Sequence, residues 1–168
     1  EGSIGEGLRS LWTSRYVALA AAFFAFCSML WVFYAWFPSF LNERYKLSMT
    51  ASGFNATVFL QLSAWAGVLL GGTLADWLTK RVPAGRFYIA AAGVGLSAPF
   101  GYLTFAAETL EMTKIFAMVY GAFSGLMIGN TFAAAVDVVP KRHYGLGAGI
   151  LNMVGGIAGA ILILLAGM

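Results

Sequence analysis

Two long apolar runs of this chain are joined by the segment Gly71-Gly72-Thr73-Leu74-Ala75-Asp76-Trp77-Leu78-Thr79-Lys80-Arg81. The first run begins near Phe54 and the second at Phe87. A single carboxylate, Asp76, stands where the first run ends, and basic residues follow at positions 80, 81 and 86. A carboxylate at a bilayer centre is penalised by about 2.5 to 3.5 kcal/mol. An acid at the edge of such a run therefore indicates a function or a specific ion pair.

The composition indicates a membrane protein. Hydrophobic residues make up 60% of the chain and charged residues only 10%, and the mean hydropathy is +0.80. Soluble domains carry about 25% charged residues. The net charge is +3, and the basic residues lie in the segments between the apolar runs. No row of basic residues alternates with aromatic residues, so nucleic acid is not expected as a partner. The single cysteine, Cys27, lies in an apolar run and is interpreted as a packing residue.

Five apolar runs are long enough to cross a bilayer, which requires about 20 helical residues. The predicted fold class is therefore an all-α polytopic membrane protein with five transmembrane helices. Residues 1–15 are polar and are interpreted as a cytoplasmic tether that ends a central loop, and residues 16–168 as a helical half-bundle. The predicted spans are 16–41, 54–78, 87–107, 115–139 and 145–167.

Loop charge predicts the orientation. Alternate connections, namely the tether, the loop 80–86 and the loop at Lys141 and Arg142, carry seven of the ten basic residues. Positive residues favour the cytoplasmic side. We therefore expect the N-terminus and both of these loops in the cytoplasm, and the protein in a plasma membrane, the inner membrane of a bacterium.

Polar side chains within the spans are candidates for contact with a solute. An amide in hydrocarbon needs a partner, which is either another helix or a bound molecule. Both readings stay open for each residue. The candidates are Tyr34, Asn55, Gln61, Asn130 and Asn152.

An enzyme would need a nucleophile with a base, or metal ligands, at membrane depth. The only histidine, His143, lies in a basic loop, and the sequence has no His-Glu-x-x-His pattern. No catalytic or metal site is expected, and no cofactor beyond a coupling proton or cation.

The pattern Gly72-x-Leu74-Ala75-Asp76 followed by Lys80-Arg81 resembles the loop signature of the major facilitator superfamily. The departures are Trp77 and Thr79, where the family usually has Arg and Gly. The segment Trp36-Phe37-Pro38-Ser39-Phe40-Leu41, and Asp137-Val138-Val139-Pro140 ahead of a Gly-rich run containing Asn152, resemble the anion:cation symporter branch. Tyr144 stands where that branch often has Arg.

The resemblance covers nearly the whole chain and implies spans seven to eleven of a twelve-helix transporter. It implies that two halves rock about a central site to move a small solute, an organic anion for this branch, by alternating access. Asp76 would then close the cytoplasmic side against a helix N-terminus of the other half. Plausible ion-pair partners around it are Lys80, Arg81, Asp137, Lys141 and Arg142.

The expected partners are the lipid bilayer, a small solute and a missing N-terminal half. The chain begins at Glu1 rather than Met, and a sixth span would be needed to complete the half, so we expect a fragment of a longer protein. The spans contain no charge away from their ends, and the counter-charge for an anion would have to come from the other half. The alternatives are a non-transporting membrane subunit or scaffold, or a half-transporter that needs a partner chain.

Overall fold

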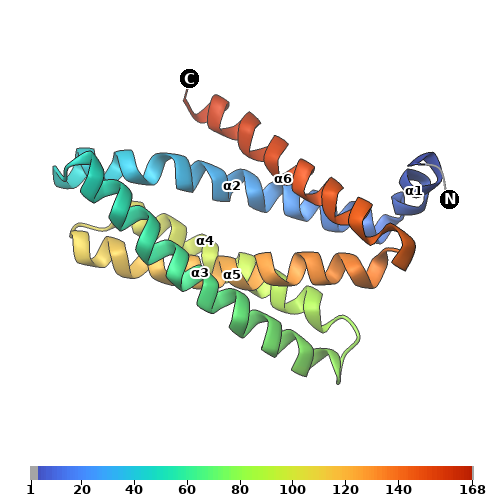
Figure 1. Ribbon diagram of the computed structural model, residues 1–168. Coiled ribbons are helices and arrows are strands. Elements are labelled where there is room, and N and C mark those ends of the chain that lie inside the picture. The colour runs from blue at the N-terminus through green and yellow to red at the C-terminus, as the bar shows by residue number, and fades with distance from the viewer. Residues whose placement is uncertain (1–3, 168) are drawn as a thin grey trace. The chain divides into compact units, whose positions relative to one another are not determined.

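Helices account for nearly all of the computed structural model, which describes residues 4–167 (Figure 1). No strand is found in that range. The elements, in chain order, are α1 (Ile4–Leu11), α2 (Ser14–Tyr45), α3 (Met49–Thr79), α4 (Gly85–Ala106), α5 (Leu110–Val138), the 3-10 turn η1 (Lys141–His143) and α6 (Tyr144–Ala166).

Five helices of the described chain are long and apolar enough to span a membrane, as predicted. They are α2, α3, α4, α5 and α6, the last counted together with η1. A helix satisfies all of its backbone hydrogen bonds internally, which is why an apolar run of this length adopts it in lipid.

The helices continue into the polar residues that flank the apolar runs. The connection between the first two predicted spans, 16–41 and 54–78, is reduced to residues 46–48, because α2 continues to Tyr45 and α3 begins at Met49. The amide of Asn42 donates to the carbonyl of Leu47 at 2.6 Å and closes the turn. Ser48 then caps α3 by accepting from the backbone N–H of Ala51 at 3.2 Å. These local hydrogen bonds make polar sequence helical right up to the turn.

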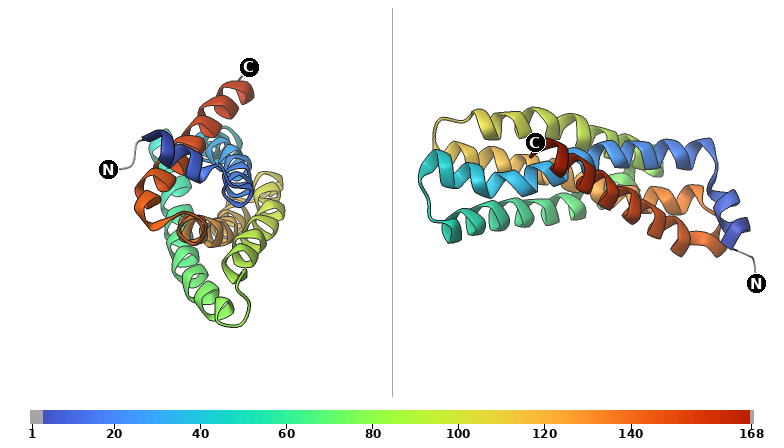
Figure 2. Two further views of the ribbon diagram at one scale, coloured as in Figure 1. Left: turned by 90° about the vertical axis from the view of Figure 1, so that its right-hand side faces the viewer. Right: turned by 90° about the horizontal axis from the view of Figure 1, so that it is seen from above.

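The N-terminal segment, expected as a tether, contains the short helix α1. Its residue Leu11 is buried, whereas the adjoining Trp12 is 83% exposed. Thr13 accepts a hydrogen bond from the backbone N–H of Tyr16 at 3.3 Å and so begins α2. Figure 2 shows α1 beside the start of α6, which it contacts.

The chain divides into two compact units, and the divisions fall inside α2 and α5. The first unit comprises residues 1–32 and 131–168, of which 4–32 and 131–167 are described. The second unit comprises residues 33–130.

Close helix packing holds the second unit together. Helices α3 and α4 run antiparallel as neighbours, joined by a short turn (Figures 1 and 2). Helix α5 touches α3 through glycines: a Cβ on Gly67 would overlap the carbonyl oxygen of Ala122, and a Cβ on Gly125 would overlap that of Ala64. Only residues without a side chain allow backbones to approach so closely, which is a common way for membrane helices to associate.

The end of α2 completes this unit with aromatic packing and a polar tie. The ring of Phe33 stacks on Tyr120 of α5 with centroids 4.2 Å apart, and Phe37 is 1% exposed. The hydroxyl of Tyr45 donates to the carbonyl of Ala107 at 3.0 Å and shares a 2.7 Å hydrogen bond with Thr113. Tyr45 therefore connects α2 with the C-terminal cap of α4 and with the start of α5.

In the first unit, the start of α2 packs against the end of α5 and against α6. Phe23 meets Phe132 edge to face with centroids 5.7 Å apart. The hydroxyl of Tyr16 donates to the carbonyl of Gly147 at 2.6 Å in a buried setting.

Candidate functional site

Asp76, the residue predicted to close the cytoplasmic side, lies near the end of α3. The helix continues to Thr79, and the carboxylate of Asp76 accepts a hydrogen bond from the guanidinium of Arg86 at 3.1 Å. The side chain of Asp76 is 66% exposed and that of Arg86 is 25% exposed. Arg86 is the second residue of α4, so the ion pair bridges the turn between the two helices.

Arg86 was absent from the predicted set of partners. Of the two bases that were in that set and lie in this unit, Arg81 places its guanidinium 4.2 Å from the centroid of the Trp77 ring. Lys80 is exposed at the C-terminal cap of α3. The sequence contained one signal for Arg86, since a base one residue after the start of α4 faces the end of α3 across a short turn.

The Asp76–Arg86 pair contributes little to folding. Exposed ion pairs are worth about 0–1 kcal/mol because water screens them. The exposed acceptor oxygens of Asp76 remain available to another donor. This geometry suits an ion pair that Asp76 can exchange for another hydrogen-bond donor better than a permanent ion pair.

The remaining loop-motif residues differ in burial. Ala75 is fully buried, Leu74 is 46% exposed, and Gly72 is half-buried with open space where a Cβ would stand. The small residue at 75 is thus required by packing, whereas the structure shows no packing reason for the glycine at 72.

Three predicted gate residues, Asp137, Lys141 and Arg142, belong to the first unit. All three are exposed, with Asp137 in the last turn of α5 and the two bases in η1.

The three asparagines on the spans share one local geometry. In each case the side-chain N–H donates to the backbone carbonyl four residues earlier: Asn55 to Ala51 at 2.7 Å, Asn130 to Leu126 at 2.8 Å and Asn152 to Ala148 at 3.2 Å. Asparagine often competes for backbone groups in this way. The amide oxygen and the second N–H retain their capacity to bind, since these residues show no other side-chain hydrogen bond to residues 4–167.

Asn130 and Asn152 differ in accessibility. Asn130 is 1% exposed, and its amide nitrogen lies 3.1 Å from where a Cβ on Gly71 would stand, so it packs against α3. Asn152, in the first unit, is exposed on α6. The position of Asn130 favours helix packing, and that of Asn152 leaves it open to a partner.

Gln61 has the largest unused hydrogen-bonding capacity among these candidates. It is half-buried on α3, and its amide makes no hydrogen bond within the described part of the chain. Trp65, one turn further on, is 64% exposed. Tyr34 is half-buried on α2, next to the buried Phe33. An amide beside an exposed aromatic ring can recognise a molecule with hydroxyl groups and an apolar face.

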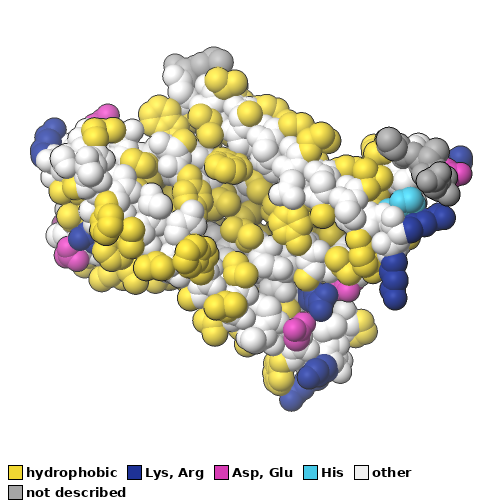
Figure 3. Space-filling model, viewed as in Figure 1, with side chains coloured by type: hydrophobic (Ala, Val, Ile, Leu, Met, Phe, Trp, Pro, Cys, Tyr) yellow, Lys and Arg dark blue, Asp and Glu magenta, His cyan; other side chains and the backbone are white. Residues whose placement is uncertain are grey.

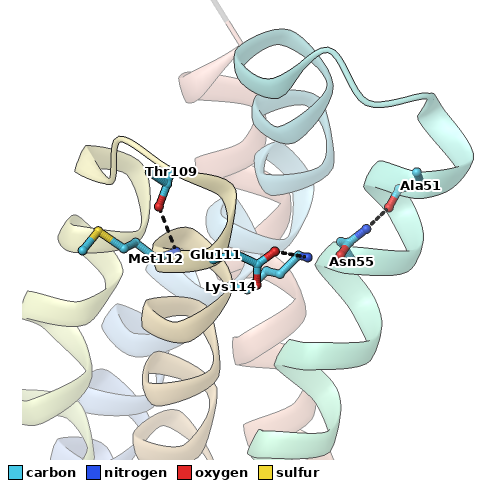
Figure 4. A network of polar contacts seen from close by, with 6 residues as sticks. All are labelled: Ala51, Asn55, Thr109, Glu111, Met112 and Lys114. Atoms are coloured by element: carbon cyan, nitrogen blue, oxygen red, sulfur yellow. Dashed lines mark hydrogen bonds and ion pairs between the residues drawn. The ribbon is translucent and has the colours of Figure 1, made fainter.

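Lys114, which directly precedes the predicted span 115–139, lies within α5. That helix begins at Leu110, so Lys114 is in its second turn, with a side chain only 20% exposed. Its ammonium pairs with Glu111 at 2.9 Å and lies 5.5 Å from the centroid of the Phe59 ring. Figure 4 shows the Lys114 side chain reaching from α5 toward Asn55 of α3. A lysine in such a place can bury its aliphatic stem and keep its ammonium on a charged partner, here Glu111.

Among residues 4–167, no group of three His, Cys, Asp or Glu side chains is placed to hold a metal ion.

Comparison with known proteins gives the family. The sequence profile described as Major Facilitator Superfamily matches residues 1–163. A D-galactonate transporter of Escherichia coli O6:H1 is 28% identical over 86% of this chain and 34% of its own length. The "Probable galactarate/D-glucarate transporter GudP" of Escherichia coli K12 is 30% identical over 80% of this chain and 30% of its own length. The chain thus spans about a third of the length of the curated relatives it matches.

Both relatives are named as transporters and not as enzymes. The profile match covers nearly the whole chain, and five of its helices are suited to crossing a membrane. The chain is an integral membrane protein and belongs to the major facilitator superfamily of membrane transporters.

Proposed function

We propose that this chain is part of a secondary transporter that moves a small organic anion, of the sugar-acid class, by alternating access. Family membership supports solute transport. The names of the relatives, which refer to galactonate and to galactarate and D-glucarate, support the substrate class. Sugar acids carry at least one carboxylate together with several hydroxyl groups, so a binding site must recognise both.

The observation that carries the proposal is the unused hydrogen-bonding capacity of the amides on the spans. Gln61 makes no side-chain hydrogen bond to a described residue, and Asn152 is exposed with one N–H engaged on its own helix. Amide oxygens accept hydrogen bonds from hydroxyl groups, and amide N–H groups donate to hydroxyl or carboxylate oxygens. An unsatisfied amide in hydrocarbon is costly, so a solute that carries hydroxyl groups is a fitting partner for each of these amides.

The carboxylate of the solute needs a positive charge. The spans of this chain supply none near their centres, and Lys114 lies in the second turn of α5 beside Glu111. We therefore assign the principal counter-charge, and any carboxylate that couples transport to a proton or cation, to an N-terminal half of the same transporter.

The Asp76–Arg86 pair is assigned to gating. Its exposed carboxylate can accept hydrogen bonds from the N-terminus of a helix in the other half, where the helix dipole supplies partial positive charge. Rocking between two halves about a central site would make and break that contact. The bias of basic residues toward alternate loops supports a cytoplasmic position for this end, in a bacterial inner membrane.

Uptake measurements on amide variants of the full-length protein test the proposal. We expect Gln61→Leu to reach the membrane in normal amounts and to lose D-galactonate uptake, because the amide that would bind the hydroxyl groups of the solute is removed. Asn130→Leu should instead lower folded yield, because Asn130 is buried against α3. The neighbouring exposed Leu62, changed to Met, is the matched control and should retain uptake.

Full activity of a well-folded Gln61→Leu variant would remove this residue from the site. Failure of the wild-type protein to move any solute, with both amide variants altering only folding, would favour the alternative of a non-transporting membrane subunit.

A further inference from the structure

The first unit carries a basic patch where two of its spans begin. We define the patch by Arg9 of α1, Arg15 at the start of α2, and Lys141 and Arg142 of η1, all exposed. We propose that this patch binds the phosphodiester headgroup of an anionic phospholipid. The proposal is independent of the transported solute.

Helix α1 is fixed against the start of α6. A Cβ on Gly7 would lie 3.3 Å from Nδ1 of His143, so the backbone of α1 lies directly on the ring. Leu11 is 3% exposed and lies near Gly147 of α6. The bases of α1 and η1 are therefore held on adjoining segments of one unit. Figure 3 shows Lys and Arg side chains gathered around the single histidine.

The patch lies at the boundary between lipid and water. Arg15 is the second residue of the span Ser14–Tyr45, and Lys141 and Arg142 are the first residues of the span Lys141–Ala166. Clusters of four or more Lys and Arg next to a membrane span are typical binding sites for anionic lipids, each base contributing about 1 kcal/mol. Trp12, 83% exposed, adjoins the cations.

The exposed apolar groups favour a lipid over a soluble anion. Trp12 and Leu8, which is 47% exposed, flank Arg9 on and just after α1. Tryptophan prefers the headgroup level of a bilayer, where its ring is buried and its N–H stays in polar surroundings. A free phosphate would satisfy the bases and leave both apolar side chains in water, whereas a phospholipid covers them with its glycerol and acyl chains.

The electrostatic balance remains positive when the nearby acids are included. Glu6 of α1 and Asp137 of α5 belong to the same unit and are both exposed. Four bases against these two acids leave the described patch at +2. In addition, no side chain caps the N-terminus of α6, so its first-turn N–H groups add partial positive charge beside η1.

Native mass spectrometry of the full-length protein in detergent tests the proposal, with phosphatidylglycerol and phosphatidylcholine as the titrated lipids. We expect phosphatidylglycerol to be retained selectively by the wild type. The variant Arg9→Gln/Arg15→Gln should weaken that binding roughly 25-fold, since two bases are neutralised. Both side chains are exposed and show no side-chain hydrogen bond to a described residue, so the variant should fold.

Two matched variants separate charge from position. Arg9→Lys/Arg15→Lys keeps the charge and should bind within a few-fold of the wild type. Arg44→Gln/Lys46→Asn removes two exposed charges at the other end of α2 and should leave binding unchanged; Asn is chosen because Lys46 has a φ of 55°, which asparagine tolerates.

Three results would overturn the proposal. These are equal retention of phosphatidylcholine and phosphatidylglycerol by the wild type, an equal loss of binding in the variant at Arg44 and Lys46, and complete displacement of phosphatidylglycerol by excess inorganic phosphate. The last result would identify a site for free phosphate.

Discussion

The contact between α3 and α5 leads to a sharp prediction about two glycines of the same helix. Gly67 and Gly53 both lie in α3. A Cβ on Gly67 would overlap the carbonyl oxygen of Ala122, whereas a Cβ on Gly53 would meet nothing within 4 Å. We therefore expect Gly67→Ala to be destabilising and Gly53→Ala to be neutral or stabilising.

The magnitude follows from the difference between the two variants. Each alanine gains about 0.8–1.0 kcal/mol of helix propensity over glycine, and this gain cancels in the comparison. What remains is the cost of overpacking, about 1–3 kcal/mol. The upper part of that range is expected, because the obstructing atom belongs to the backbone of α5 and cannot rotate away.

The assay is equilibrium unfolding of the purified full-length protein in mixed detergent micelles, followed by far-UV circular dichroism. Gly125→Ala, which would meet the carbonyl of Ala64, should behave like Gly67→Ala. The double variant should cost less than the sum of the two, because one Cβ already separates the helices. Equal stability of Gly67→Ala and Gly53→Ala would refute the close approach of α3 and α5.

Further predictions concern three polar contacts. Tyr45→Phe removes hydrogen bonds to Ala107 and Thr113 and should cost about 1–2 kcal/mol in the same unfolding assay, whereas Tyr102→Phe, at a side chain 75% exposed, should cost nothing measurable. Tyr16→Phe removes the side-chain hydrogen bond to the carbonyl of Gly147, which still accepts a backbone hydrogen bond within α6, and should cost about 0.5–1.5 kcal/mol; an unchanged stability would show that this contact is dispensable. Arg86→Gln removes the ion pair with Asp76, and loss of this pair should cost less than about 1 kcal/mol because the Asp76 carboxylate is 66% exposed to solvent. The variant should nevertheless slow uptake by the full-length transporter; unchanged uptake would exclude a gating role for this pair.

The five membrane helices could be predicted from sequence because charge-free runs of this length have few other ways to satisfy their backbone in lipid. Their ends could not be placed accurately. Asn42 and Ser48 are polar and indicated a loop, but the hydrogen bonds they make to Leu47 and Ala51 compress that loop to a tight turn. Such capping contacts depend on backbone geometry that hydropathy does not report.

The candidate site was harder to foresee. Asp76 stood out as an isolated acid, yet its partner is Arg86, and Arg81 instead lies on Trp77. Lys80, Arg81 and Arg86 all lie within ten residues of Asp76, and only the geometry of the turn selects among them. The backbone hydrogen bonds of Asn55, Asn130 and Asn152 are local, and the side-chain propensities of asparagine could have indicated them.

The central claim is transport of an organic anion, and uptake of a radiolabelled sugar acid by liposomes containing the full-length protein tests it most directly. We predict saturable uptake that is inhibited by other sugar acids and unaffected by the corresponding neutral sugar. Uptake no greater than that of protein-free liposomes for every sugar acid tried, or equal inhibition by the neutral sugar, would contradict the account.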